Sequence, residues 1–130
     1  MSPKPILLIE DNEQNRYLVT FLLVRHGYPV LAATDGQQGI DMAQAHAPSL
    51  ILLDLQLPTM DGYSVARALR NIEELREIPI IAVTSYAMSG DREKAMASGC
   101  NGYLEKPIDP DRFVAQIAQF LPASSPEPMM

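Results

Sequence analysis

Leu50-Ile51-Leu52-Leu53-Asp54 (LILLD, residues 50–54) is the stretch that decides the fold. Four consecutive apolar residues without polar alternation are typical of a strand that is covered on both faces of a sheet. Similar runs stand at residues 6–9 (ILLI) and 80–83 (IIAV), and weaker ones at 30–33 and 103–104. The sequence therefore predicts five short strands, most of them buried.

Helical patterns with recognisable ends separate these strands. Side-chain oxygens that can cap a helix stand at Asp11-Asn12, at Thr34 (with Gln37 at capping-box spacing), at Asp61, at Ser89 or Asp91, and at Asp109 ahead of Pro110. The expected helix ends are Gly27, the residue before Pro48, Leu69 and Gly99, and the last helix should bury Phe113, Ile117, Phe120 and Leu121.

A β-α unit repeated five times predicts an α/β fold. Because such crossovers are right-handed, we expect a (βα)5 doubly wound, five-stranded parallel sheet of flavodoxin-like topology, with helices on both faces. We expect one domain over residues 1–121 and a disordered tail over residues 122–130 (PASSPEPMM). Residues that carry chemistry should stand just after the strands.

Composition narrows the function classes. The net charge of −6 and the pI near 4.7 argue against a nucleic-acid-binding surface, which needs clustered Lys and Arg. The single cysteine, Cys100, excludes an intramolecular disulfide. No apolar run approaches the roughly 20 residues of a membrane span, and the N-terminus does not resemble a signal peptide. We therefore expect a cytoplasmic protein that binds neither nucleic acid nor membrane.

The residues that follow the strands form a chemical set. They are Glu10 and Asp11, Asp54, Thr84, and Lys106. Taken singly, each has an ordinary structural explanation, such as a helix cap or a surface charge. Taken together, three carboxylates at one sheet edge would repel one another by about 4 kcal/mol for each pair 4 Å apart at an effective dielectric near 20. Hard oxygen ligands of this kind suit Mg²⁺.

The same residues carry a family resemblance. Glu10-Asp11, Asp54 in LLDLQLPTMDG, Thr84 in AVTSYAM and Lys106-Pro107 in GYLEKP resemble the signature of the response-regulator receiver domain, which is CheY-like in fold, over about residues 5–121. The phrases IEDNEQN, LDLQLP and AVTSYAMSGD resemble DivK-type single-domain regulators most. The resemblance implies a phosphoprotein of a two-component or phosphorelay system, a switch rather than a turnover enzyme.

The resemblance also implies roles. Asp54 would accept a phosphoryl group from a phosphohistidine, and Lys106 would neutralise charge on the transferring oxygens. Mg²⁺ would be bound by Asp11 and Asp54 directly, by Glu10 through water and by the backbone carbonyl of Gln56. Thr84 would move towards the phosphate and let Tyr103, the family's switch aromatic, turn inwards. A strand-end tyrosine with its hydroxyl in water is the alternative for Tyr103.

Further expectations concern two positions beside the site and one peptide bond. Gln56 and Tyr86 flank its mouth, and bulky Tyr86 would shield the acyl phosphate and slow its hydrolysis. The Lys106-Pro107 bond resembles a family position that has a cis peptide.

Two surfaces are candidates for partners. The first helix, with Asn15, Leu18 and Leu22, and the loop at Pro107 would dock a sensor histidine kinase or a histidine phosphotransfer protein, although Leu18 and Leu22 suit the core equally well. A second face, with Arg92, Tyr103, Glu105, Arg112 and Gln116, would bind a downstream protein when Asp54 is phosphorylated. We expect a monomer or a weak dimer. A phosphorelay intermediate or phosphate sink, or a phosphorylation-independent interaction module, is the alternative function.

Other enzyme classes fit less well. A haloacid-dehalogenase-type phosphatase needs a second Asp at the position of Gln56, and a flavodoxin needs a phosphate-binding loop where Glu10-Asp11 stand. A Walker-type nucleotidase needs a GxxxxGK motif, which the sequence lacks.

Overall fold

The computed structural model describes residues 4–85 and 88–121 and has an alternating β-α order. The strands are β1 (Ile6–Ile9), β2 (Val30–Ala33), β3 (Leu50–Asp54), β4 (Ile80–Thr84) and β5 (Gly102–Glu105). The helices are α1 (Glu13–Arg25), α2 (Gly36–His46), α3 (Gly62–Arg70), α4 (Asp91–Ala97) and α5 (Phe113–Ala118), with a 3-10 turn, η1 (Glu73–Leu75). The predicted tail, 122–130, and Tyr86 lie outside the described residues.

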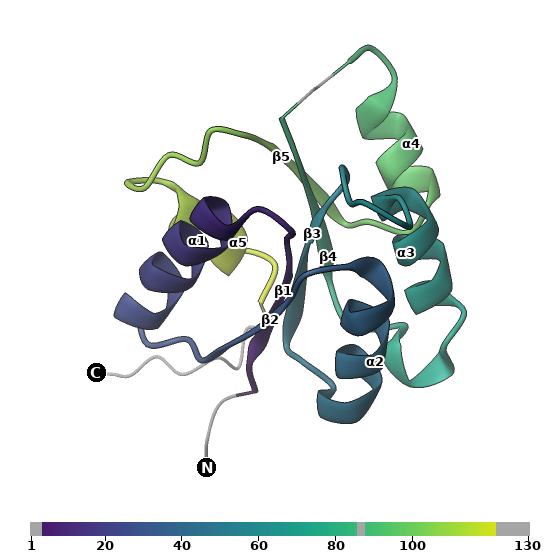
Figure 1. Cartoon of the computed structure of the whole chain (residues 1–130), viewed down its shortest axis with the longest axis horizontal. Helices are drawn as coiled ribbons and strands as arrows, with labels where there is room; N and C mark the ends of the chain where they lie inside the picture. Colours follow the sequence, from purple (N-terminus) through teal and green to yellow (C-terminus); the bar gives the residue numbers. More distant parts are fainter. Residues whose placement is uncertain (1–3, 86–87, 122–130) are drawn as a thin grey trace.

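The sheet is parallel throughout, in the order β2-β1-β3-β4-β5. All the residues of β1, β3 and β4 are buried, as their continuous apolar runs predict. Helices α1 and α5 cover one face, and α2, α3 and α4 cover the other (Figure 1). Two apolar clusters fill the space between the layers, one on each face of the sheet. The predicted (βα)5 architecture is confirmed.

The caps of α1 and α3 are the ones that the sequence predicts. Asn12 accepts a hydrogen bond from the backbone N–H of Asn15 at 2.9 Å, and Asp61 accepts one from Ser64 at 2.9 Å. α1 ends at Arg25, and Gly27 follows with a positive φ of 90°. Each of these helices thus begins next to a strand end that carries an acidic residue.

The predicted starts of α2 and α5 are wrong, whereas α4 begins at one of its two predicted positions. Asp35, not Thr34, caps α2: its carboxylate accepts from the Gln38 N–H at 2.8 Å, while the Thr34 N–H and hydroxyl both donate to the Gln38 side chain. α4 begins at Asp91, as one of the two alternatives predicted, and the left-handed backbone of Gly90 ends the loop before it.

The start of α5 differs most from the prediction. Asp109 forms a turn of its own, with its carboxylate accepting from the Asp111 N–H at 3.0 Å, and α5 begins only at Phe113. Phe113 and Ile117 are buried as expected. Phe120 and Leu121 lie beyond the end of α5 and are only partly buried.

Gly62 brings α3 close to the loop that follows β3. A Cβ atom at this position would lie 2.6 Å from the Leu55 Cα and 2.8 Å from the Asp54 carbonyl oxygen. The Gly62 N–H also donates to the Leu55 carbonyl at 3.1 Å. Because both neighbours are backbone atoms that cannot move aside, only glycine fits, and α3 is held against the residue at the centre of the strand-end set.

Candidate functional site

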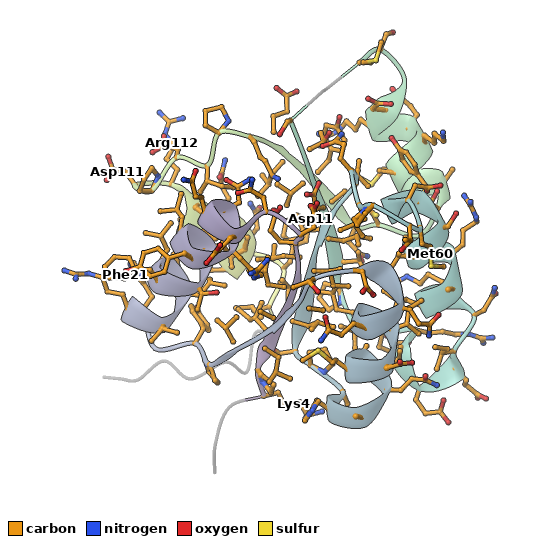
Figure 2. The ribbon with its side chains drawn as sticks, viewed as in Figure 1. Lys4, Asp11, Phe21, Met60, Asp111 and Arg112 are labelled. Carbon is orange, nitrogen blue, oxygen red and sulfur yellow. The ribbon has the colours of Figure 1, made fainter. Side chains whose placement is uncertain are left out.

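The ends of β1 and β3 place three carboxylates together. Glu10, Asp11 and Asp54 each offer an oxygen, and these atoms all lie within 4.8 Å of one another. Glu10 and Asp54 are only 3% and 4% exposed, whereas Asp11 is exposed to solvent. Asp11 stands where β1 gives way to α1 (Figure 2). The site is therefore open on the Asp11 side and closed beneath Glu10 and Asp54.

Lys106, which follows β5, is the cation of this cluster. Its Nζ lies 3.0 Å from the Glu10 Oε1 and 3.2 Å from the Asp54 Oδ2. The Lys106 backbone N–H donates to the Thr84 carbonyl at 2.8 Å, which fixes the base of its side chain at the end of β4. The Lys106-Pro107 peptide is cis. One ammonium thus pairs with two of the three acids.

Burial and the unequal charges shift two pKa values. Burial raises the pKa of Glu10, and the nearby charge of Asp54 adds to this effect, while the hydrogen bond from Lys106 opposes it. Burial by itself would lower the pKa of Lys106, but the carboxylates of Glu10 and Asp54 outweigh it and raise this pKa. Lys106 therefore remains an ammonium, and the cluster keeps a negative surplus that favours a further cation.

Backbone N–H groups orient the two buried carboxylates. The Asn12 N–H donates to the Glu10 Oε2 at 3.1 Å, and the Gln56 N–H donates to the Asp54 Oδ1 at 2.9 Å. Each bond comes from a residue two positions further along the chain, so the turn that leaves the strand also holds the acid at its end. The Gln56 side chain reaches across to β4, where its amide hydrogen-bonds the Thr84 hydroxyl.

Tyr103 lies on β5, with its ring packed against the cluster beneath α2, α3 and α4. Its hydroxyl is buried, which contradicts the alternative that places it in water, and has no hydrogen-bond partner among residues 4–85 and 88–121. Burial raises the pKa of this phenol. The Arg92 guanidinium lies over the ring, 5.6 Å from its centroid. A buried hydroxyl without a partner is unfavourable, so a rotation of this side chain towards a partner would be favoured.

The residues predicted for partner binding lie around the cluster. Asn15 lines a small hollow together with Glu10, Asp54 and Lys106, and Pro107 is exposed beside them. Leu22 is buried and Leu18 packs against the core, so their docking role is not supported.

The first helix also exposes an apolar stripe that the sequence analysis missed. Tyr17, Phe21 and Val24 are 72%, 47% and 55% exposed. Figure 2 shows Phe21 pointing away from the body of the protein. Apolar residues surround this helix in the sequence YLVTFLLV, so their period could not distinguish the outer face from the inner one.

The predicted output face carries two exposed arginines. Arg92 lies on α4 over Tyr103, and Arg112 lies at the start of α5, where it forms an exposed ion pair with Asp109 at 3.7 Å. Figure 2 shows Arg112 and Asp111 at the outer end of the loop that leads into α5. Neither arginine takes part in the acidic cluster.

Comparisons with known proteins agree with this geometry. A family model described as "Response regulator receiver domain" matches residues 6–118. The chain belongs to the response-regulator receiver family.

Curated relatives of this receiver include the polar-differentiation response regulator DivK of Brucella anthropi. The two are 42% identical over 119 residues, which cover 92% of this chain and 97% of that protein. DivK of Brucella ovis is also 42% identical, over 91% of this chain and 96% of its own. The protein is thus a DivK-like receiver of two-component signal transduction, a phosphoryl-accepting signalling module.

Solved receiver structures share the fold. The chemotaxis protein CheY4 of Vibrio cholerae superimposes with a TM-score of 0.87 at 26% identity, covering 92% of this chain and 99% of that one. The receiver domain of the sensor histidine kinase PA1611 of Pseudomonas aeruginosa, with a magnesium ion coordinated in its active-site cleft, gives a TM-score of 0.84 at 37% identity, covering 91% of this chain and 97% of that one.

No helix in the described parts of the chain is long and apolar enough to cross a membrane.

Proposed function

We propose that Asp54 is the phosphoacceptor of this receiver. One of its carboxylate oxygens attacks the phosphorus of a phosphohistidine, the P–N bond breaks, and the imidazole nitrogen keeps the electron pair and takes up a proton. The product is an acyl phosphate on Asp54. The observation that carries the proposal is that Lys106 pairs with Glu10 at 3.0 Å and Asp54 at 3.2 Å while Asp11 keeps the site open to solvent.

The donor set of the cluster fits Mg²⁺. Its oxygens are hard ligands, they lie within 4.8 Å of one another, and they carry more negative charge than Lys106 offsets. Asp11 and Asp54 would bind the ion directly, Glu10 would bind it through water, and the Gln56 carbonyl would add a backbone ligand. A bound Mg²⁺ would supply positive charge to the oxygens of the transferring phosphoryl group. A magnesium-bound receiver among the structural relatives supports this assignment.

The other residues of the site would act on the phosphoryl group or respond to it. The Lys106 ammonium, held between Glu10 and Asp54, would neutralise a phosphoryl oxygen. The Thr84 hydroxyl would donate a hydrogen bond to another phosphoryl oxygen. Movement of Thr84 would let Tyr103 rotate. The Tyr103 hydroxyl is buried and has no hydrogen-bond partner within the described part of the chain, which supports a second position for that ring. The protein would therefore hold phosphate as a switch and not turn over a substrate as an enzyme.

Partner surfaces follow from the exposed residues. A sensor histidine kinase or a histidine phosphotransfer protein would approach over Asn15, Pro107 and the exposed side of α1. A downstream protein would bind the face that carries Arg92, Arg112 and Tyr103 when Asp54 is phosphorylated. We place the protein in the cytoplasm, as a monomer or weak dimer, with the receiver domain over residues 1–121.

The test is incubation with a small phosphodonor and Mg²⁺, followed by intact mass measurement. The parent should gain one phosphoryl group, and Asp54→Ala should gain none. Omission of Mg²⁺ should abolish the gain in the parent. An undiminished gain in Asp54→Ala would overturn the assignment of the phosphoacceptor.

A phosphorelay intermediate or phosphate sink is the second candidate, because the same site serves it without an output partner. The face around Tyr103 distinguishes the two. In a switch, backbone amide signals of Arg92 and Tyr103 should shift on phosphorylation by more than those of α2 on the same face of the sheet. Shifts confined to Asp54 and its immediate neighbours would favour the sink.

A further inference from the structure

Gln56 contacts both sides of the site at once. Its backbone N–H donates to the Asp54 Oδ1 at 2.9 Å, and its side-chain NH2 donates to the Thr84 Oγ1. Its side-chain carbonyl accepts from the Ser85 N–H at 3.1 Å. A single residue thus joins the loop after β3 to the end of β4, across the carboxylate of Asp54.

The direction of these bonds follows from the donors. The Ser85 backbone N–H can only donate, so the side-chain oxygen of Gln56 must face it. The NH2 group of Gln56 then faces Thr84, whose hydroxyl oxygen accepts. Both groups of the side-chain amide are therefore engaged, and they hold the Thr84 side chain and the Ser85 backbone in one arrangement, which we call the Gln56 clamp.

The clamp opposes the movement that the switch requires, if the proposed function of Asp54 and Thr84 holds. Thr84 must bring its hydroxyl to a phosphoryl oxygen on Asp54, and a displacement of Thr84 and Ser85 breaks or lengthens the bonds from the Gln56 side chain. We propose that Gln56 is a positioning residue that stabilises the resting arrangement and thereby sets how readily the protein enters the phosphorylated conformation.

Bulk is the competing explanation for any effect of Gln56. The side chain is exposed on the rim of the site, so its volume alone, without its hydrogen bonds, could affect ligand binding by covering Asp54. Gln56→Met separates the two, because methionine keeps the length of the side chain but lacks both the amide donor and the carbonyl acceptor. Gln56→Ala removes the bulk as well. Gln37→Met is the matched control, since Gln37 lies on α2 and bonds only to Asp41 within the described part of the chain.

The experiment titrates each protein with beryllofluoride in saturating Mg²⁺, since beryllofluoride mimics a phosphoryl group without hydrolysis. Two-dimensional NMR follows the Thr84 and Ser85 amides. Loss of the clamp should tighten beryllofluoride binding about fivefold in Gln56→Met, as expected for the loss of one neutral hydrogen bond from the resting state alone. Gln56→Ala should match it, and Gln37→Met should match the parent.

The resting spectra give a second readout that a merely structural role would not move. Before any addition, the Tyr103 amide of Gln56→Met should lie part of the way along the line that joins the resting and saturated positions of the parent. Tyr103 is used for this readout because the Ser85 N–H bonds to Gln56 directly and would shift on loss of that bond alone. The unfolding midpoint of Gln56→Met without beryllofluoride should fall slightly, because the lost hydrogen bond stabilised the resting state.

The outcomes separate this inference from the function on which it rests. If the parent binds beryllofluoride and Gln56→Met binds it equally or more weakly, the clamp is wrong and the proposed function stands. A gain in Gln56→Ala without one in Gln56→Met would also overturn the clamp, in favour of bulk. A parent that binds no beryllofluoride would overturn both.

Discussion

The carboxyl edge and the amino edge of the sheet differ in how their charged side chains are paired. At the carboxyl edge, three carboxylates share one ammonium, and Lys106 satisfies only Glu10 and Asp54. At the amino edge, one guanidinium is surrounded by neutral acceptors. Arg70, at the end of α3, donates to the carbonyls of Gly99 at 2.8 Å, Leu75 at 3.1 Å, Arg76 at 3.3 Å and Ile78 at 2.8 Å, and to the Asn101 side chain at 2.7 Å.

The difference shows which edge stabilises the fold and which one serves the function. The Arg70 hub joins α3 to η1 and to the segments that lead into β4 and β5, so every donor bond there braces the structure. The carboxyl edge keeps a surplus of negative charge: Lys106 pairs with Glu10 and Asp54, while the Arg16 guanidinium donates to the backbone carbonyls of Glu10 and Asp11 and not to their carboxylates. Such a surplus costs stability and persists where a ligand completes the site.

The largest expected effect is at the Arg70 hub. Arg70→Met should lower the free energy of unfolding by about 4 kcal/mol, because several half-buried carbonyls lose a charged donor at once. Chemical denaturation measures it, with Arg76→Met as an exposed control that should change by less than about 0.5 kcal/mol. Mg²⁺ should restore none of the loss. A variant as stable as the parent would remove the contrast between the two edges.

Lys106→Met should cost less, about 2 kcal/mol, since Glu10 can take up a proton when its cation is gone. Unlike the loss in Arg70→Met, the loss of unfolding free energy in Lys106→Met should be largely recovered in saturating Mg²⁺, because the ion supplies positive charge to the same carboxylates. The measurement is denaturation with and without Mg²⁺. Equal responses of the Arg70 and Lys106 variants to Mg²⁺ would show that the edges are not different.

Removal of the metal should have a smaller effect in the parent. Mg²⁺ at ten times its Kd should raise the free energy of unfolding by about 1.4 kcal/mol, and chelation should reverse this. Asp11→Asn should lose most of the response, since Asp11 provides the open side of the site. Asp61→Asn is the matched control on the next acidic loop, because Asp61 caps α3 and lies outside the cluster.

The smallest expected effect on the free energy of unfolding near neutral pH concerns Cys100, beside the Arg70 hub. Burial raises the pKa of its thiol from 9.0 to about 11. Alkylation near pH 8 should therefore be roughly a hundredfold slower in the folded protein than in the unfolded one, and Mg²⁺ should not alter it. Because folding keeps the thiol neutral, this group lowers the free energy of unfolding as the pH rises from 9.0 towards about 11. A fast reaction of the folded protein would show that the amino edge opens.

The fold and the acidic cluster could be predicted because topology alone places them. Apolar runs specify β1, β3 and β4. Residues that follow parallel strands must meet at one edge of the sheet, so the proximity of Glu10, Asp11, Asp54 and Lys106 could be predicted from the order of the strands and helices alone. Local capping was less predictable. Thr34 and Asp35 both offer a capping oxygen. The Gln38 N–H donates to Asp35, and the Gln38 side chain accepts from the Thr34 N–H.

The features that the sequence did not reveal depend on pairs of distant residues. Nothing local indicates that Gln56 reaches Thr84, or that Arg70 meets Gly99 and Asn101, because each contact needs the folded sheet to bring its partners together. The exposed stripe of α1 is a different case. Its residues are as apolar as the buried Leu22 and Leu23, and only packing distinguishes the two faces.

In the proposed function Asp54, and not a neighbouring acid, takes the phosphoryl group. Borohydride reduces an acyl phosphate to an alcohol, so treatment of the phosphorylated parent followed by peptide mass mapping identifies the modified residue. The account predicts homoserine at position 54, with Glu10 and Asp11 unchanged. Reduction at Asp11, or a phosphoryl group that borohydride does not remove from this peptide, would contradict it.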